Sequence, residues 1–427
     1  MHGSTSKYFC VAENKALQER ICESEFKPGL EVDPMLKAVI FDMDGVIIDS
    51  EPQHARAALR VLNRHGANAD YDYCSSFIGS STKVFTQDIM KRFPLSISLE
   101  DLLEEMNLEK KKILKEEGYA IIEGITDLIK KLYHAGIRLA IASSSSPTEI
   151  ENTVKALHIK KYFTKLISCA HVEHPKPAPD SFLLALKELG VSPQETVVVE
   201  DSCFGSQAAK AAGIPCVGYL NPHSGNQDLS AANVLLESFV GIDERFFHNI
   251  LCRSLGKPVM IADTKRLFIR ELEPKDIKEI YQIYKDPDIR QYIPDIDDYL
   301  EEEMKKQEAY IKNVYSFYGY GMWGIFSKTS KKLIGKCGIE NLEVDGKNEI
   351  VLSYLLDTNH WGYGYALECC RAVFTYAKEE LDIKRIVAVI DKKNTRSQNT
   401  AKNLGMTIEK EIPYKGHDCY LYSIQLD

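Results

Sequence analysis

The first half of the chain alternates short, continuous apolar runs with longer amphipathic segments. The runs cover residues 36–41, 137–142, 165–168, 196–200 and 214–219. None of them alternates apolar with polar residues, which is typical of strands that are covered on both faces. Because parallel neighbours need a crossover, usually a helix, this order predicts an α/β fold with a parallel sheet.

Two departures from this alternation divide the chain. Between residues 51 and 118 the sequence is helical and charged, which predicts a helical insertion after the first strand. A second succession of strand and helix patterns begins near residue 263. We therefore expect an N-terminal extension of unassigned role (1–34), a first domain (35–240) with its core at 35–50 and 119–240 and its cap at 51–118, a linker (241–262), and a mixed α/β domain (263–427).

Composition limits the classes of partner. The net charge of -9 argues against a nucleic-acid partner, because such binding needs an excess of basic residues. Residues 1–34 lack the apolar run of a signal peptide or membrane span. The 11 cysteines include no CxxC pattern and fit reduced core thiols. We expect a cytoplasmic protein with no membrane partner.

Acidic residues follow two of the predicted strands. Asp42 and Asp44 come directly after the first run, and Glu200 and Asp201 end the run at 196–200. Open α/β sheets place ligands at the carboxyl ends of their strands, so these acids are expected at one crevice. Carboxylates gathered there repel one another unless a cation intervenes, and Mg²⁺ takes oxygen ligands. For Asp201 alone, a role as helix N-cap is about equally good.

Two further features could bind an anion. The run at 137–142 leads into four serines, 143–146, whose hydroxyls and amides can hold phosphate oxygens. Lys176 lies just before a helical pattern, where the helix dipole disfavours a cation and an anionic ligand would explain it. Serine-rich loops are common, so this feature is not specific by itself.

Taken in order, D-x-D-G-V, the serine-bearing strand end, K-P-x-P-D and V-V-E-D-S resemble the haloacid-dehalogenase-like hydrolases. FDMDGVIIDSEPQH with its helical cap resembles the β-phosphoglucomutase-like branch, over about 36–240. The resemblance implies a Rossmann-like phosphatase core in which Asp42 forms an aspartyl phosphate and Asp44 is the acid and base. It also implies phosphate contacts from Ser143, Ser144 and Lys176, and a Mg²⁺ site made by Asp42, Asp44, Glu200 and Asp201.

Phosphatase and mutase chemistry remain alternatives. The mutase branch carries a cap arginine after a glycine, whereas the matching stretch here reads FIGSSTKVF, with Thr82 in place of the arginine. The neighbouring Lys83 is a poor replacement for a bidentate arginine. We therefore favour a phosphatase that acts on a small phosphorylated metabolite. His54, Gly79 and Lys83 match cap positions that lie near the substrate in relatives.

A glycine-broken loop is the main chemical feature of the second domain. It reads W-G-x-G-x-A and lies between a strand pattern and a helix pattern. Gly362 and Gly364 permit close backbone approach, and the free amides at a helix start can bind a pyrophosphate. Alone, the motif could equally be a tight packing turn.

The order TKRLFIRELEPKD, HWGYGYALE and N-x-x-S ending in L-G-M resembles the GNAT acetyltransferases, more narrowly the ribosomal-protein N-acetyltransferase branch, over about 263–425. This resemblance implies acetyl-CoA as cofactor and an amine acceptor, either a small molecule or a protein N-terminus. It implies cofactor contacts from Leu355, Leu356, Gly362, Tyr363, Gly364, Tyr365, Ala366, Asn394 and Ser397.

The acetyltransfer base is not identified by this resemblance. Val351 stands where relatives often carry Glu, so Glu349 is the candidate base, and Tyr414 is a possible acid because Ala401 replaces the usual tyrosine. We predict a bifunctional enzyme, a Mg²⁺-dependent phosphatase fused to an acetyl-CoA-dependent N-acetyltransferase. The alternative is a β-phosphoglucomutase-type mutase with a C-terminal regulatory module that binds acetyl-CoA.

Overall fold

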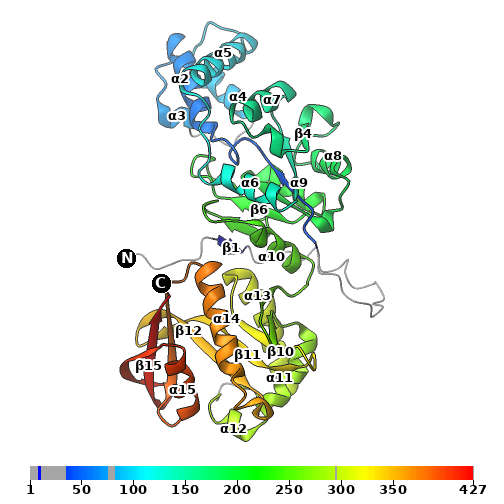
Figure 1. Ribbon diagram of the computed structural model, residues 1–427. Coiled ribbons are helices and arrows are strands. Elements are labelled where there is room, and N and C mark those ends of the chain that lie inside the picture. The colour runs from blue at the N-terminus through cyan, green and yellow to red at the C-terminus, as the bar shows by residue number, and fades with distance from the viewer. Residues whose placement is uncertain (1–7, 11–34, 76–81, 294–295, 427) are drawn as a thin grey trace. The chain divides into compact units, whose positions relative to one another are not determined.

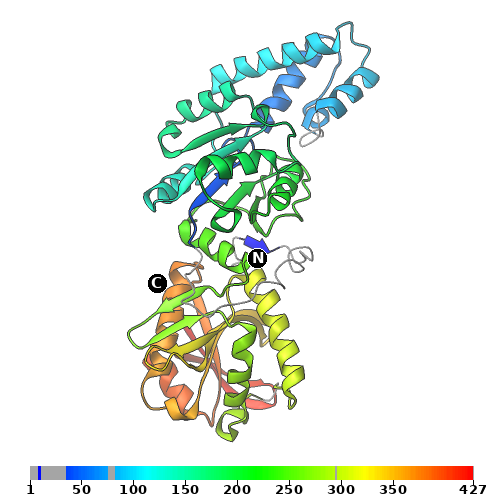
Figure 2. The same ribbon diagram turned by 90° about the vertical axis from the view of Figure 1, so that its right-hand side faces the viewer.

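The computed structural model describes residues 8–10, 35–75, 82–293 and 296–426. The chain divides into two compact units, and the boundary falls between Leu255 and Gly256. Each unit combines a sheet with helices, so the predicted α/β class is confirmed for both (Figure 1, Figure 2).

A seven-stranded sheet with the order β1-β7-β6-β5-β2-β3-β4 forms the centre of the first unit. All neighbours are parallel except β1, which pairs antiparallel with β7. The five apolar runs correspond to β2–β6, whereas β1 and β7 were not predicted because three residues carry little pattern. The strands are β1 Tyr8–Cys10, β2 Ala38–Phe41, β3 Arg138–Ser143, β4 Lys165–Ser168, β5 Thr196–Glu200, β6 Cys216–Tyr219 and β7 Val234–Leu236.

Helices cover both faces of this sheet. Val39 and Phe41 pack in one core with α6, α7 and α10, and Ala38 and Ile40 pack in the other with α8 and α9. Since successive strand residues point to opposite faces, both sides of β2 must be apolar. The helices are α6 Ile125–His134, α7 Pro147–Ala156, α8 Asp180–Leu189, α9 Cys203–Ala211 and α10 Glu244–Ser254, with 3-10 turns η1 Lys160–Tyr162, η2 Cys169–His171 and η3 Pro193–Glu195.

The predicted helical insertion forms a cap with its own apolar core. Val61, Leu62, Ile89 and Leu102 are fully buried within it. Ser98 caps α5 by accepting a hydrogen bond from the Asp101 amide at 3.1 Å. The cap helices are α2 Glu51–Arg64, α3 Tyr71–Ser75, α4 Thr82–Arg92 and α5 Leu99–Glu117.

The structure differs from the linker expected at 241–262. Helix α10 lies in this segment, and its Phe247, Ile250 and Leu251 are buried in the core of the first unit. β8 follows and belongs to the second sheet. A single three-turn helix after the last strand carries too short a period to be separated from a connecting segment by sequence alone.

An eight-stranded mixed sheet with the order β14-β15-β13-β12-β11-β10-β9-β8 forms the second unit. Its strands β12 and β13 are parallel, and Val351 and Val387 are their only paired residues. The strands are β8 Met260–Asp263, β9 Leu267–Arg270, β10 Met322–Ser327, β11 Leu333–Val344, β12 Lys347–Leu356, β13 Arg385–Asp391, β14 Thr407–Tyr414 and β15 His417–Gln425. The helices are α11 Ile277–Tyr284, α12 Pro287–Arg290, α13 Leu300–Tyr318, α14 Tyr365–Glu379 and α15 Thr395–Asn403, with η4 Pro274–Asp276 and η5 Thr358–His360.

Two observations bear on the surroundings of the protein. No helix in the described ranges combines the length and the apolar character that crossing a membrane requires. Nine cysteines of the described residues, between Cys74 and Cys419, are free thiols.

Replacing Phe247 by alanine tests whether α10 is part of the first core. We expect the free energy of unfolding of the first unit to fall by about 3–5 kcal/mol, because a fully buried aromatic side chain is removed. Val240→Ala, at a position that is 43% exposed, is the control and should change it by less than about 1 kcal/mol. If both changes lower the free energy of unfolding equally, as measured by urea unfolding, α10 is a connecting segment and not part of the first core.

Candidate active sites

The edge of the first sheet is organised around β2. This strand lies between β3 and β5, and Phe41 pairs with Ile141 on one side and with Val199 on the other. Asp42 therefore leaves the sheet beside Glu200, and its amide donates to the Val199 carbonyl at 2.9 Å. This is the position at which open α/β sheets bind their ligands.

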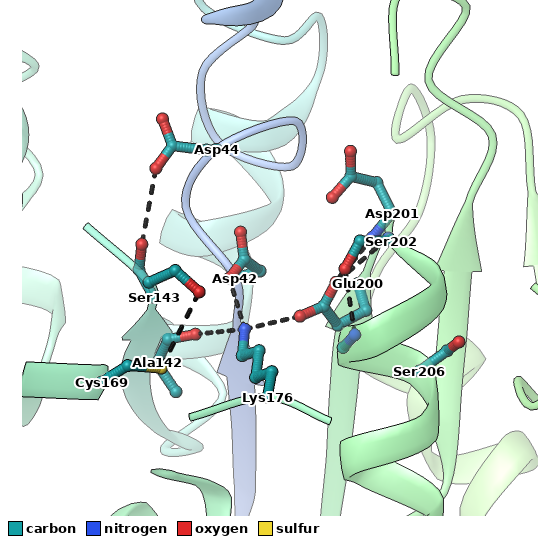
Figure 3. A network of polar contacts seen from close by, with 12 residues as sticks. Asp42, Asp44, Ala142, Ser143, Cys169, Lys176, Glu200, Asp201, Ser202 and Ser206 are labelled. Carbon is teal, nitrogen blue, oxygen red and sulfur yellow. Dashed lines mark hydrogen bonds and ion pairs between the residues drawn. The ribbon is translucent and has the colours of Figure 1, made fainter. Parts of the chain in front are cut away.

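Lys176 joins the groups at this edge. Its Nζ lies 2.5 Å from Asp42 Oδ1, 2.6 Å from Glu200 Oε1 and 2.9 Å from the Ala142 carbonyl oxygen (Figure 3). Burial lowers the pKa of Lys176, but the two carboxylates outweigh it and raise the pKa well above its ordinary value. The carboxylates themselves explain a lysine before this helix, so the structure needs no anionic ligand to account for it.

Both carboxylate oxygens of Glu200 accept hydrogen bonds from other groups of the protein. Its Oε2 accepts hydrogen bonds from the Asp201 amide at 3.1 Å and from the Ser202 amide and hydroxyl at 3.2 and 2.9 Å. Its other oxygen accepts from Lys176. The expected direct role of Glu200 as a metal ligand is therefore not what the geometry favours. Glu200 positions Lys176 and the start of α9.

Asp201 packs against the loop that follows β2. Gly45 has φ +82°, and a Cβ at this position would lie 1.9 Å from Asp201 Oδ2. Asp201 is buried, and Ser224 donates a hydrogen bond to its carboxylate. The glycine of the D-x-D-G motif thus allows the Asp201 carboxylate to reach the loop that carries Asp42 and Asp44.

This acidic edge carries more negative than positive charge. Burial raises the pKa of Asp42 to about 7, with Glu200 and Asp44 adding to the effect and Lys176 opposing it. Burial also raises the pKa of Asp201 well above its ordinary range, reinforced by Glu200 and Asp42. Repulsion of this kind favours a bound cation.

The residues fit Mg²⁺ only as a hydrated ion. In the described part of the chain, three side-chain ligand atoms of His, Cys, Asp or Glu lie within 4.8 Å of one another in one group alone, which is Cys337, Cys369 and Cys370 in the second unit. The acidic side chains therefore do not by themselves form a complete set of metal ligands. Mg²⁺ commonly keeps several waters and needs one or two carboxylates, which Asp42 and Asp201 can supply.

Serine hydroxyls hold Asp44. Ser50 donates to Oδ1 at 2.8 Å and Ser145 donates to Oδ2 at 2.6 Å, while Ser143 lies 3.5 Å from Oδ2. The predicted phosphate residue Ser144 is exposed, and its Oγ lies 3.8 Å from Cys169 Sγ. The structure thus brings Ser143 and Ser145 to the site and not Ser144, as expected for alternate residues at a strand end.

The cap contributes charged groups near Asp44. His54 lies on α2, and burial, followed by Lys110, lowers its pKa to about 4. Burial, followed by Asp44, raises the pKa of Glu51 to about 7. Lys110 on α5 was not predicted, because nothing in a charged helix marks one lysine. Gly79 and the side chain of Lys83 lie outside the described residues.

The second unit contains a cavity of about 1320 Å³ where β12 and β13 separate beyond Val351 and Val387. Tyr363 does not line it and is 64% exposed. All other residues predicted to bind the cofactor line this cavity, namely Leu355, Leu356, Gly362, Gly364, Tyr365, Ala366, Asn394 and Ser397.

The start of α14 presents backbone amides at this cavity. Gly362 and Gly364 have φ +82° and +78°, and no side chain caps the helix. Arg266 holds the loop by donating to the Tyr363 carbonyl at 2.8 Å and pairing with Glu368 at 2.6 Å. An uncapped helix start of this kind is suited to an anion such as a pyrophosphate. Arg266 was not predicted, since its role depends on contacts distant in sequence.

The predicted base Glu349 does not reach the cavity. Its two carboxylate oxygens accept hydrogen bonds from Arg385 at 3.2 and 3.3 Å. Glu340 on β11 does line the cavity and pairs across the sheet with Val351, the position expected to carry Glu. Tyr414 lines the cavity too. Glu340 on the neighbouring strand thus places a carboxylate at the cavity beside Val351.

Comparisons with known proteins match each unit separately. Residues 39–219 match the haloacid dehalogenase-like hydrolase family, and residues 266–407 match the acetyltransferase (GNAT) domain. Fructose-1-phosphate phosphatase YqaB of Escherichia coli is 33% identical over 42% of this chain and 94% of its own length. Phosphorylated carbohydrates phosphatase of Thermotoga maritima is 33% identical over 42% of this chain and 82% of its own length. A solved putative β-phosphoglucomutase from Thermotoga maritima is 31% identical over 50% of this chain and 96% of that chain, with a TM-score of 0.43.

The parallel sheet, the two aspartates after its central strand and the buried lysine, together with the match over residues 39–219, define the first unit as a hydrolase, and residues 266–407 of the second unit match an acetyltransferase domain. The chain belongs to the haloacid dehalogenase-like hydrolase family and carries a GNAT domain after the hydrolase.

Replacing Gly45 by alanine tests the packing of Asp201 on the acidic loop. Gly66→Ala is a matched control, because Gly66 has a similar φ of +78° with nothing within 4 Å of the added Cβ. The control should cost only the left-handed backbone strain, about 1–2 kcal/mol. Gly45→Ala should cost ~1–3 kcal/mol more in urea unfolding and should lower phosphatase activity. Equal costs would show that Asp201 does not press on the loop.

Proposed function

We propose that the first unit is a Mg²⁺-dependent phosphomonoesterase acting on a small phosphorylated metabolite through an aspartyl phosphate. The observation that carries the proposal is the cluster of Asp42, Asp44, Asp201 and Lys176 at the carboxyl edge of the sheet. The similarity to two phosphatases named for sugar phosphates supports a phosphorylated carbohydrate as the substrate class.

The chain's own groups fit two successive displacements. An Asp42 oxygen forms a bond to phosphorus while the ester oxygen leaves with a proton from Asp44. Asp44 then takes a proton from water, which attacks phosphorus and releases phosphate and free Asp42. Ser143 holds a phosphoryl oxygen, Lys176 does so by exchanging its hydrogen bond to Asp42 for one to the phosphoryl group, and Mg²⁺, when bound at Asp42 and Asp201, would offset charge on the transferring group.

The variant Asp42→Asn should lose phosphatase activity by roughly three or more orders of magnitude, because the amide cannot act as the nucleophile. Phosphate release from a panel of sugar phosphates, with Mg²⁺ and after its chelation, is the measurement. Asp127→Asn, an exposed position on α6, should match the unaltered chain. Full activity of Asp42→Asn, or activity of the unaltered chain that survives chelation, would contradict the proposal.

We further propose that the second unit uses acetyl-CoA to acetylate an amine. The observation that carries this proposal is the uncapped start of α14 at a cavity opened by the separation of β12 and β13. Amides 362–366 would hold the pyrophosphate, and Leu355 and Leu356 would lie along the pantetheine arm. Direct transfer needs a neutral amine close to the thioester.

Placing a carboxylate at the helix start tests the cofactor site. Ala366→Asp should weaken acetyl-CoA binding by about tenfold or more, ~1.4 kcal/mol, because the new charge repels the pyrophosphate. The same charge favours a helix N-terminus, so stability should be kept. Thr375→Asp, which adds the same charge further along α14 at an exposed position, is the control. Titration calorimetry that finds equal affinity for both variants would refute this site.

A further inference from the structure

Lys336 is a buried cation inside the cavity of the second unit. It lies on β11, is 5% exposed and lines the cavity. Across the sheet it pairs with Leu355, at the strand end that we assign to the pantetheine arm. Directly paired strand residues have their side chains about 5 Å apart on one face. Lys336 therefore lies on the side of the cavity where an acceptor would meet the thioester.

The partners of Lys336 are neutral. Its Nζ donates to Tyr284 Oη at 3.1 Å and to Gln307 Oε1 at 3.4 Å. The rings of Tyr284 and Tyr310 lie 5.9 and 5.7 Å from it. An ammonium group has three donors, so one remains beyond these two acceptors. In the described part of the chain, Lys336 forms no ion pair.

Glu303, a buried acid near Lys336, forms its hydrogen bonds with other residues. It accepts hydrogen bonds from the Gln307 side chain at 2.8 Å and the Asp297 amide at 3.3 Å, and Lys306 lies 3.9 Å away. Gln307 therefore separates this carboxylate from Lys336. A buried ammonium that lacks a close anion is costly, which favours an anionic ligand beside Lys336.

Glu340 supplies a charge of the opposite sign. It is four residues from Lys336 on the same strand face, a spacing of about 13 Å along the strand. It lines the same cavity and accepts a hydrogen bond from Tyr310 Oη at 2.9 Å. One cavity wall thus presents a cation and an anion, and Tyr310 contacts both of them.

We propose that the acceptor is an amine that carries its own anionic group, a carboxylate or a phosphate. Lys336 binds the anion, and Glu340 takes the excess proton of the ammonium group. The neutral nitrogen then bonds to the acetyl carbon, the carbon–sulfur bond breaks, and CoA leaves as the thiol with a proton from the nitrogen. This inference rests on the proposed acetyl transfer, and it disfavours an ordinary peptide N-terminus, which has an amide in place of the anion.

The test compares amines that differ only in the anion. The standard amino acids are paired with their amides, and O-phosphoethanolamine with ethanolamine, in the full chain carrying Asp42→Asn so that phosphate esters stay intact. Thiol release gives kcat and KM, and calorimetry on the CoA-loaded chain gives binding. We expect at least one anionic amine to have a KM about tenfold or more below that of its neutral partner. The two kinds of pair distinguish a carboxylate from a phosphate.

Three variants separate anion binding from a structural role. Lys336→Met should remove the preference for the anionic amine with little change for the neutral one, and Lys336→Arg should restore part of it. Lys332→Met, at an exposed position near the start of β11, is the control and should behave as the parent. CoA binding and melting temperature should stay unchanged in all three.

The outcomes separate this inference from the proposed function. Acetylation with equal KM values within every pair, or a preference that survives Lys336→Met, would overturn the anion site and leave acetyl transfer standing. Binding of anionic amines that depends on Lys336, without turnover of any amine, would remove the acetyl transfer and keep the anion site. Absence of both binding and turnover would overturn both.

Discussion

The contact of Lys176 with Asp42 and Glu200 is the interaction on which the first unit's site depends. Four carboxylates end at one edge of a buried sheet, and without this ammonium group their mutual repulsion would oppose folding. The lysine is fixed on a third side by the Ala142 carbonyl. Its single charge does not balance the cluster, and the remaining negative charge is what makes the edge suited to a metal cation.

The second unit differs electrostatically from the first, because its cavity is suited to an anion and not to a cation. Its cavity offers unpaired backbone amides at α14 and a buried ammonium at Lys336, so the positive potential comes from the fold and from one side chain. The separation of β12 from β13 makes the space, since each strand stops pairing with the other after one residue pair. Carrying both units in one chain keeps the two activities at equal stoichiometry.

Side-chain directions place several neighbouring residues at the sites where other residues were expected. Ser144, expected to bind phosphate, lies beside Cys169, whereas Ser145 reaches the site and donates to Asp44, because adjacent residues at a strand end point apart. Glu340 enters the cavity in place of Glu349, because Arg385 occupies Glu349 from the next strand. Glu200 accepts a hydrogen bond from Lys176 and does not offer a free oxygen to a metal ion. In each case the contacts that decide where the side chain lies come from residues that are distant in sequence.

The sequence by itself determined strands β2–β6 of the first sheet, the helical insertion, the acids at the ends of β2 and β5, and the glycine-broken loop before α14. These features are local, because unbroken apolar runs, helical periodicity and glycine are read within a few residues. Only the tertiary structure decided that Lys176 compensates Asp42 and Glu200, that Gly45 makes room for Asp201, that α10 packs in the first core, and that Lys336 and Glu340 share one cavity. These depend on strand order and cross-strand register, which bring together residues that are distant in sequence, and no local pattern records which partner a buried charge will meet.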